Sequence, residues 1–262
     1  MGDVRAPARR PGWWPGWPKR AFDVAAASGA LIVLAPFLGV TALAIRLVLG
    51  RPVIFAQRRP GRHARPFILY KFRTMSGGRA ADGRLLPDRE RLTRLGRLLR
   101  RTSLDELPEL VNVIRGDMSL VGPRPLLMEY LPRYTREQAR RHDVRPGITG
   151  WAQLNGRNTL PWERRFVLDV WYVEHQSFRL DARILLLTVW HALAQVGVSQ
   201  PGEGTEEHFR GREPATDVPA SDTPTPDIEV ARGEPDRASS RRDRLNLSAL
   251  RRFGAAEAHR WS

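Results

Sequence analysis

The stretch that decides the fold is residues 24–45, VAAASGALIVLAPFLGVTALAI, which runs for 22 residues without a charged side chain. At about 1.5 Å per residue, an α-helix of this length can reach across a bilayer core of about 30 Å. The run is apolar on every side, whereas a helix on a soluble core normally keeps a polar face. The sequence therefore predicts a membrane helix, and a buried helix of a soluble protein is the weaker alternative.

The charges around this run bear on how the helix meets the membrane. Basic residues occupy both flanks, and positive flanks prefer the cytoplasmic side. Pro36 lies in the middle, where it removes a backbone hydrogen bond and kinks a helix. A re-entrant helix, which bends at Pro36 and returns to the same face, satisfies both flanks; a spanning helix stays open as the alternative. Three tryptophans, Trp13, Trp14 and Trp17, fit an interfacial anchor where the helix would enter. The flanking basic residues are Arg5, Arg9, Arg10, Lys19 and Arg20 before the run, and Arg46, Arg51, Arg58, Arg59 and Arg62 after it.

The remaining sequence predicts a small β element followed by helices. Residues 52–57 and 66–73 have the composition of extended segments around a turn at Pro60 and Gly61. A leucine stripe at 92–99, surrounded by arginines, predicts an amphipathic helix that lies on anionic headgroups or packs with a solvated basic face. Further helices are expected over 105–115, 126–142, 161–175 and 181–196. The expected fold is mainly α with a small β element.

Charge is distributed unevenly along the chain. The whole sequence holds 43 Lys and Arg against 28 Asp and Glu, whereas residues 201–262 hold 10 against 12, so residues 1–200 are strongly basic. A body this basic is expected to meet nucleic acid, a lipid surface or a phosphorylated substrate. The Pro-, Ser- and acid-rich composition after residue 200 predicts a disordered tail. The absence of cysteine excludes disulfides and thiolate chemistry.

The most informative polar segment places two carboxylates, Asp105 and Glu106, at the start of a predicted helix. Pro108 is tolerated only in a first turn, so this helix should begin close to Asp105. Helix N-termini bind phosphate, and an ionised Asp105 could attack a phosphorus held there while Glu106 binds Mg²⁺. Read locally, an Asp105 N-cap and a capping box between Ser103 and Glu106 form the stronger interpretation.

Other polar residues are candidate ligands for phosphate. Lys71 and Arg73 follow an extended segment and should share one face of it. Arg124 is held between two prolines, which suits a rigid clamp, although from the local sequence alone a turn with an exposed arginine is the stronger interpretation. Asp169 lies among aromatic residues of a predicted helix, as the buried partner of an arginine or as a site residue. No P-loop, hydrolase or metalloprotease signature is present. No helix-turn-helix or RNA-binding signature is present either, so nucleic acid is not the expected partner.

Taken together, these motifs resemble the bacterial sugar transferase family, the monotopic polyprenyl-phosphate phosphoglycosyl transferases. They follow the order of the family over about residues 19–200, and an ordered set is far more specific than one block. The matching stretches are Lys19-Arg20-Ala21-Phe22-Asp23, Pro52-Val53-Ile54-Phe55, Lys71-Phe72-Arg73-Thr74-Met75, Ser103-Leu104-Asp105-Glu106-Leu107-Pro108-Glu109-Leu110, Asn112-Val113-Ile114-Arg115-Gly116-Asp117-Met118-Ser119-Leu120-Val121-Gly122-Pro123-Arg124-Pro125, Arg145-Pro146-Gly147-Ile148-Thr149-Gly150-Trp151-Ala152-Gln153 and Asp169-Val170-Trp171-Tyr172-Val173.

The resemblance implies a mechanism and reverses the local interpretation of the acidic pair. Asp105 would attack the β-phosphate of a UDP-sugar and release UMP, and a polyprenyl (undecaprenyl) phosphate would then take the phosphosugar from the aspartate. Glu106 would bind Mg²⁺, Arg124 would hold the nucleotide or its phosphates, and Asp169 matches a site carboxylate. Lys71, Arg73 and Arg100 are further expected phosphate contacts.

The same resemblance implies an arrangement of domains and a location. We expect an extension over 1–18, a re-entrant membrane helix broken at Pro36 over 19–49, a compact catalytic domain at the membrane interface over 50–200, and a tail over 201–262. Amphipathic surface helices and anionic lipid would hold the protein on the cytoplasmic face of the inner (plasma) membrane, and a homodimer is left open. The chain departs from the family in having Ala35-Pro36 where a Ser-Pro pair is common, and it looks like a minimal form.

Overall fold

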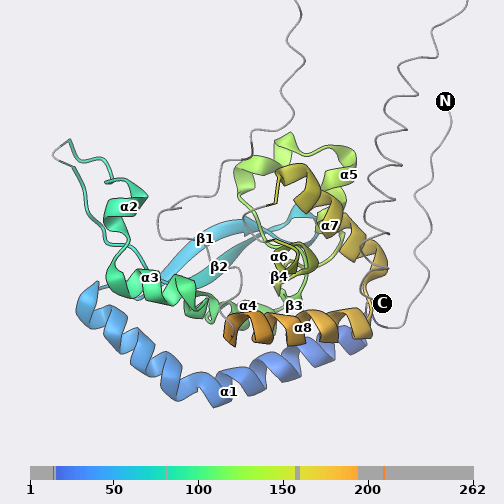
Figure 1. The fold of residues 1–262 in the computed structure, drawn as a ribbon, viewed down its shortest axis with the longest axis horizontal. Helices are drawn as coiled ribbons and strands as arrows, with labels where there is room; N and C mark the ends of the chain where they lie inside the picture. Colours follow the sequence, from blue (N-terminus) through green and yellow to red (C-terminus); the bar gives the residue numbers. More distant parts are fainter. Residues whose placement is uncertain (1–13, 15, 81, 157–159, 194–208, 210–262) are drawn as a thin grey trace, which may run out of the picture. The chain divides into compact units, whose positions relative to one another are not determined.

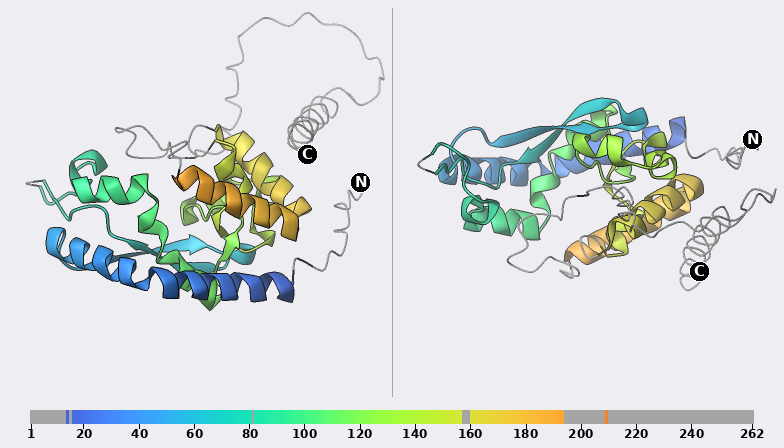
Figure 2. Two further views of the ribbon diagram at one scale, coloured as in Figure 1. Left: turned by 60° about the horizontal axis from the view of Figure 1, so that its bottom comes forward. Right: turned by 90° about the horizontal axis from the view of Figure 1, so that it is seen from above.

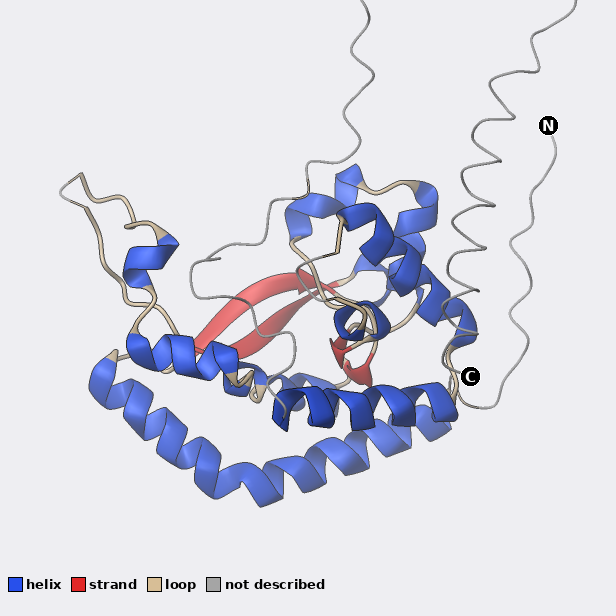
Figure 3. Ribbon diagram, in the orientation of Figure 1, coloured by secondary structure: helices blue, strands red, loops and turns tan. Residues whose placement is uncertain are grey.

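The computed structural model describes residues 14, 16–80, 82–156, 160–193 and 209. Their fold is mainly helical with two small sheets, as expected from the sequence (Figure 3). In chain order the elements, with η for 3₁₀ turns, are α1 (Trp17–Val48), β1 (Ile54–Pro60), η1 (Arg62–Ala64), β2 (Pro66–Phe72), α2 (Asp88–Arg91), α3 (Arg94–Arg101), η2 (Leu104–Glu106), α4 (Glu109–Arg115), β3 (Ser119–Val121), η3 (Met128–Arg133), α5 (Arg136–Ala139), η4 (Arg140–Asp143), β4 (Gly147–Thr149), α6 (Trp151–Leu154), α7 (Trp162–His175) and α8 (Phe178–Leu193).

The apolar run forms the helix α1, which the described part of the chain shows as its one helix long and apolar enough to cross a membrane. Most of its large side chains, such as Ile32 and Val33, are exposed. The helix bends near its middle (Figure 1) but continues through Pro36, so the predicted break is a bend. A proline removes only its own N–H from the ladder, and the neighbouring hydrogen bonds keep the helix continuous.

Both ends of α1 pack on the same folded unit, along one side of which the helix runs (Figure 2). Near the first end, Ala27 is fully buried in a cluster that includes Val113 of α4. Near the second end, Ile45 is fully buried against Phe72 of β2 and Leu99 of α3. The middle of α1 therefore stays exposed while its two ends are fixed.

The predicted extended segments form an antiparallel hairpin of β1 and β2, with register from Ile54 opposite Phe72 to Pro60 opposite Pro66. The turn contains His63 and Ala64 at positive φ. Because side chains alternate along a strand, Leu69 and Lys71 lie on one face of β2 and Phe72 lies on the other. Leu69 and Phe72 are accordingly buried in two different apolar clusters.

The predicted helix over 105–115 is corrected by the structure. Asp105 and Glu106 lie in the 3₁₀ turn η2, and α4 begins only at Glu109, after Pro108. Ser103 has a φ of 57° and its side chain makes no cap, so the predicted capping box does not form. The carboxylate of Glu106 instead binds Lys71 and Arg124, which come from elsewhere in the fold. A Glu106 side chain that folded back to cap its own turn could not make these contacts.

A parallel pair, β3 and β4, holds the segment that carries Arg124. A β-carbon on Gly147 would lie 2.1 Å from the amide nitrogen of Gly122, so this close approach requires glycine. The amide of Gly147 also donates to the carbonyl of Pro123, over 3.0 Å. These contacts fix the start of the Pro-Arg-Pro turn.

The predicted helix over 126–142 is divided into η3, α5 and η4. Pro132 and the extended residues around Thr135, which caps α5, interrupt it. Phe209 lies inside the predicted tail but is buried against Tyr130 and Phe166, because a large aromatic ring gains by leaving water. The remainder of the predicted tail, over 201–208 and 210–262, lies outside the described residues, as does most of the extension over 1–18.

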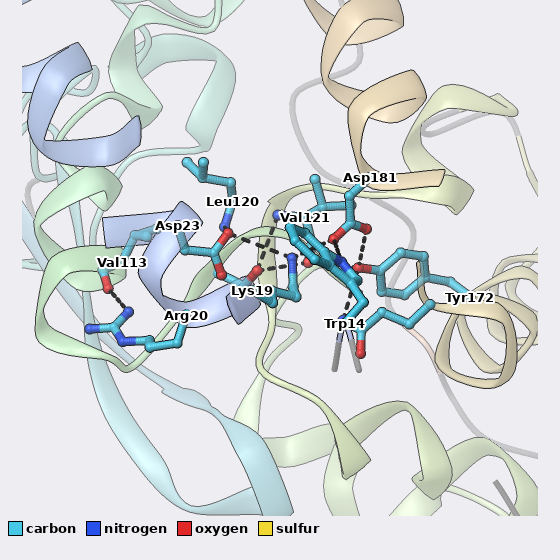
Figure 4. Close-up of polar contacts among 11 residues, drawn as sticks. Trp14, Lys19, Arg20, Asp23, Val113, Leu120, Val121, Tyr172 and Asp181 are labelled. Carbon is cyan, nitrogen blue, oxygen red and sulfur yellow. Dashed lines mark hydrogen bonds and ion pairs between the residues drawn. The ribbon is translucent and has the colours of Figure 1, made fainter. Parts of the chain in front are cut away.

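A buried polar network joins the start of α1 to α7 and α8 (Figure 4). Asp181 of α8 accepts hydrogen bonds from Lys19 Nζ at 2.6 Å, Trp14 Nε1 at 2.8 Å and the Tyr172 hydroxyl at 2.7 Å. Trp14 is thus buried rather than anchored in an interface, whereas Trp17 is 81% exposed and Trp13 lies outside the described residues. The network fixes the start of α1 against α8.

Candidate active site

The acidic pair lies in the short connection between α3 and α4. Ser103 in this connection has a left-handed backbone conformation, which is strained for a residue other than glycine. Asp105 is 9% exposed, and the side chain of Glu106 is 17% exposed. Both carboxylates therefore lie at a partly enclosed position, in contact with β2, α3 and the Pro-Arg-Pro turn.

Glu106 is held by two cations. Lys71 Nζ and Arg124 Nη2 each lie 2.6 Å from its Oε1, and Arg124 Nη1 donates to Oε2 over 3.3 Å. Two parallel hydrogen bonds between a guanidinium and a carboxylate fix orientation as well as charge. Burial alone would raise the pKa of Glu106, but the charges of Arg124 and Lys71 hold it well below its usual range. Glu106 is therefore ionised at neutral pH.

Asp105 has the opposite electrostatic character. Burial, and next the negative charge of Glu106, raise the pKa of Asp105 to about 6, against the opposing charges of Lys71, Arg100 and Arg124. A carboxylate with a raised pKa is more basic, and it is still mostly ionised at neutral pH. Two adjacent carboxylates with separated pKa values can take different chemical roles.

The three cations around Asp105 come from three separate parts of the chain. Lys71 comes from β2, Arg100 from α3 and Arg124 from the turn after β3. Arg100 is oriented by a hydrogen bond from its Nε to the hydroxyl of Thr74, at 3.1 Å. The fold thus brings together five of the seven residues that the sequence analysis proposed, and it forms a positively charged setting in which phosphate oxygens would be stabilised.

The structure places the other two proposed residues differently. Arg73 donates to the backbone carbonyls of Leu49, Arg51 and Met75, so it fixes the connection between α1 and the hairpin. Asp169 is 3% exposed and accepts two hydrogen bonds from Arg141, at 2.7 and 3.1 Å. Of the two roles left open for Asp169, the structure shows the buried arginine partner.

Arg141 connects Asp169 to the acidic pair, and the sequence analysis missed it. Its Nη2 donates to the backbone carbonyl of Arg124 over 2.7 Å, while the same group is paired with Asp169. Arg124 in turn binds Glu106. The sequence offered no signal for this residue, because a buried arginine within an Arg-Arg-His run cannot be distinguished from its exposed neighbours.

Glu109 is a second residue that the sequence analysis missed. It is 2% exposed, and its Oε1 lies 3.1 Å from Lys71 Nζ, so Lys71 is shared between two glutamates. Burial, and then the charge of Glu106, raise the pKa of Glu109 to about 7. Its position three residues after Glu106 was a usable signal, since residues three apart face the same side of a helical turn.

We expect Glu109→Gln to stabilise the protein at high pH. The pKa of Glu109 is about 7 in the folded chain against 4.5 ordinarily, so the folded state binds more protons between these values and loses stability as pH rises through them. Gln mimics the protonated side chain, so its advantage should reach about 3 kcal/mol at pH 8 and vanish near pH 4. Chemical denaturation in detergent at both pH values measures this, with the exposed Glu137→Gln as control. A variant no more stable than the original at pH 8 contradicts it.

Comparison with known proteins gives a family for this site. The sequence model of the family described as bacterial sugar transferase matches residues 14–195. The chain is 56% identical over 193 residues to an uncharacterized sugar transferase, EpsL, of Bacillus subtilis (strain 168), covering 74% of this chain and 96% of that protein. It is 40% identical over 190 residues to the exopolysaccharide production protein PSS of Rhizobium leguminosarum bv. phaseoli, covering 65% of this chain and 92% of that protein.

A longer relative is the UDP-glucose:undecaprenyl-phosphate glucose-1-phosphate transferase of Escherichia coli (strain K12). Identity is 40% over 182 residues, which cover 66% of this chain but only 39% of that protein. The match therefore concerns only one part of the longer relative. With the family match extending from Trp14 to beyond α8, the chain belongs to the bacterial sugar transferase family.

Proposed function

We propose that this protein transfers a sugar-1-phosphate from a UDP-sugar to undecaprenyl phosphate and releases UMP, as a membrane step in the assembly of an exopolysaccharide or O-antigen type glycan. The names of the E. coli and Rhizobium relatives support the reaction and the pathway class. The observation that carries the proposal is the basic carboxylate of Asp105, set among Lys71, Arg100 and Arg124. Relatives named for glucose and for N-acetylgalactosamine leave the sugar itself open.

The proposed chemistry has two displacements at phosphorus. In the first, a carboxylate oxygen of Asp105 bonds to the β-phosphorus of the UDP-sugar, the bond from that phosphorus to the bridging oxygen breaks, and UMP leaves. In the second, a phosphate oxygen of undecaprenyl phosphate bonds to the same phosphorus, and the acyl-phosphate bond breaks to regenerate the Asp105 carboxylate. A covalent intermediate divides one difficult transfer into two easier ones.

The surrounding residues have electrostatic roles in this proposal. Arg124 and Lys71 keep Glu106 ionised, and with Arg100 they offset the charge that builds on the phosphate oxygens during each displacement. Arg141 keeps the Arg124 backbone in place for this contact.

Glu106 is also the proposed ligand for Mg²⁺. The described residues hold no group of three or more metal-ligating side chains, so the protein would supply one or two carboxylates and the substrate phosphates the rest. Such a donor set fits Mg²⁺, which commonly binds one or two carboxylates together with phosphate oxygens. Glu106 supplies an ionised oxygen, and Asp105 lies beside it. When bound, the ion would draw negative charge from the transferring phosphate.

The proposed setting is the cytoplasmic face of the inner membrane, with α1 re-entrant. Ala27 and Ile45, near opposite ends of α1, are both buried against the same folded unit. A helix that crossed the bilayer would carry its far end about 30 Å from the side on which it entered. Basic residues on both flanks, Pro36 inside the helix and the bend near the middle of α1 support the same topology.

The activity is tested by incubating the purified full chain with a panel of UDP-sugars, Mg²⁺ and undecaprenyl phosphate. We expect UMP, rather than UDP, as the released nucleotide, together with an undecaprenyl diphosphate sugar. Release of UDP would show transfer of the sugar without its phosphate, and absence of either nucleotide across the panel would leave a membrane scaffold as the better reading. Either result would refute the proposal.

The topology is tested with single cysteines, since the chain has none of its own. Cysteines replacing Trp17 and Arg51, one at each end of α1, should react with a membrane-impermeant maleimide only after inside-out vesicles expose the cytoplasmic face. Lys71 and Arg124 are left intact, so UMP release reports that each variant is folded. Labelling of the two positions from opposite sides would show a spanning helix.

A further inference from the structure

A cavity of about 340 Å³ lies beside the first turn of α1, and its lining includes none of the residues assigned to the active site. The volume is in the range of pockets that bind small molecules. Four cations contribute to its walls, Lys19, Arg20, Arg62 and Arg145, against two carboxylates, Asp23 and Asp143. The charge balance therefore favours an anion.

Two of these cations converge on one helix end. Arg20 donates to the carbonyl of Val113 at the end of α4 (Figure 4). It also donates to the carbonyl of Ile114, and Arg145 Nε donates to the carbonyl of Gly116, which follows α4. A helix C-terminus carries about half a negative charge, so it offsets only part of two guanidinium groups. A bound anion would offset the positive charge that remains.

The third arginine of the cavity wall, Arg62, lies in η1. Arg62 is exposed, and its Nε donates to the backbone carbonyl of Asp143 over 3.2 Å. Within the described residues, the hydrogen bonds of Arg62 and Arg145 involve Nε alone, so the Nη groups of both are available to a ligand. By contrast, Lys19 is neutralised inside the fold, 2.6 Å from Asp181 and 3.6 Å from Asp23.

The position of the cavity identifies the source of the anion. Trp17 also lines it and is 81% exposed, at the first residue of the apolar helix α1. Exposed tryptophans collect at the level of lipid headgroups, where α1 would leave the water. Phosphate groups are dense at that level, and an arginine fork matches phosphate geometry.

We propose that this cavity binds the phosphate headgroup of an anionic membrane phospholipid, held by Arg62 and Arg145 with Trp17 beside it. The bound headgroup fixes the start of α1 at the interface, on the side where the Asp181 network joins α1 to α8. The inference uses the membrane association of α1 and does not use the chemistry at Asp105.

The test compares Arg62→Glu with Arg65→Glu, a matched exposed arginine three residues away that does not line the cavity. The full chain in mild detergent is titrated with phosphatidylglycerol or phosphatidylcholine, and retained lipid is counted by native mass spectrometry. We expect Arg62→Glu to weaken phosphatidylglycerol retention about tenfold and Arg65→Glu less than twofold, about the effect of a general surface charge. Arg62→Gln should also weaken the retention of phosphatidylglycerol. UMP release at saturating substrates in detergent should be unchanged in all three, which separates this site from the proposed reaction.

Three results would overturn the inference. Equal loss in the Arg62 and Arg65 variants would show diffuse attraction to the basic surface. Equal competition by millimolar glycerol phosphate or inorganic phosphate would identify a soluble anion rather than a lipid. A raised KM for undecaprenyl phosphate in Arg62→Glu, with unchanged phosphatidylglycerol retention, would assign the cavity to the acceptor.

Discussion

Asp105→Asn is expected to lower UMP release by a factor on the order of 10⁴ or more and to abolish the covalent phosphosugar adduct. The amide has nearly the shape of the carboxylate, but its oxygen carries no charge with which to attack phosphorus. The fold should tolerate the change, because burial and Glu106 already disfavour a charge at this position. Lys71, Arg100 and Arg124 keep their partners, so binding of the UDP-sugar should be affected far less than turnover.

Two measurements check this prediction. UMP release gives the rate, and intact-protein mass spectrometry of the chain with UDP-sugar alone detects the adduct, which peptide mapping should place on Asp105. Asp82→Asn, in an exposed loop, is the matched control and should keep both the rate and the adduct. An Asp105→Asn protein that still turns over, or an adduct mapped to Glu106 or Glu109, would show that another carboxylate is the nucleophile.

Asp169→Asn is expected to cost about 3 kcal/mol of unfolding free energy and most of the turnover. It leaves the Arg141 guanidinium, whose side chain is 1% exposed, without its compensating charge, and breaking one side of a buried pair typically costs about 3–5 kcal/mol. The activity falls because Arg141 also holds the carbonyl of Arg124, whose side chain binds Glu106. Arg141→Lys should behave alike, since a single ammonium lacks the fork that reaches both partners.

The design separates positioning from direct substrate contact. Unfolding in detergent and UMP release are measured for both single variants and for the double variant Arg141→Met with Asp169→Leu. The apolar pair of the double variant should recover much of the stability but not the turnover. Glu174→Gln breaks the more exposed pair with Arg140 and should cost less than about 1 kcal/mol. Normal turnover in Arg141→Lys, beside loss in Asp169→Asn, would instead assign Asp169 to the substrate.

The sequence by itself determined the features that depend on neighbours along the chain. The uncharged run over 24–45 predicted α1, and the two extended segments around the turn at Pro60 and Gly61 predicted the strands of the hairpin. Both predictions depend on residues that are close together in the sequence. The ordered motifs identified the family and marked Asp105 and Glu106. The local sequence, however, favoured a helix cap, because the spacing from Ser103 to Glu106 is that of a capping box. The spacing alone does not distinguish a capping box from a catalytic pair.

Only the tertiary structure decided which charges meet. Glu106 is bound by Lys71, 35 positions before it, and by Arg124, 18 positions after it, so no local pattern could foresee that the capping box would be absent. The same holds for Arg141 and Asp169, and for the two arginines that converge on the end of α4. The strength of a charged contact depends on distance and burial in space rather than on separation in sequence, and packing sets both.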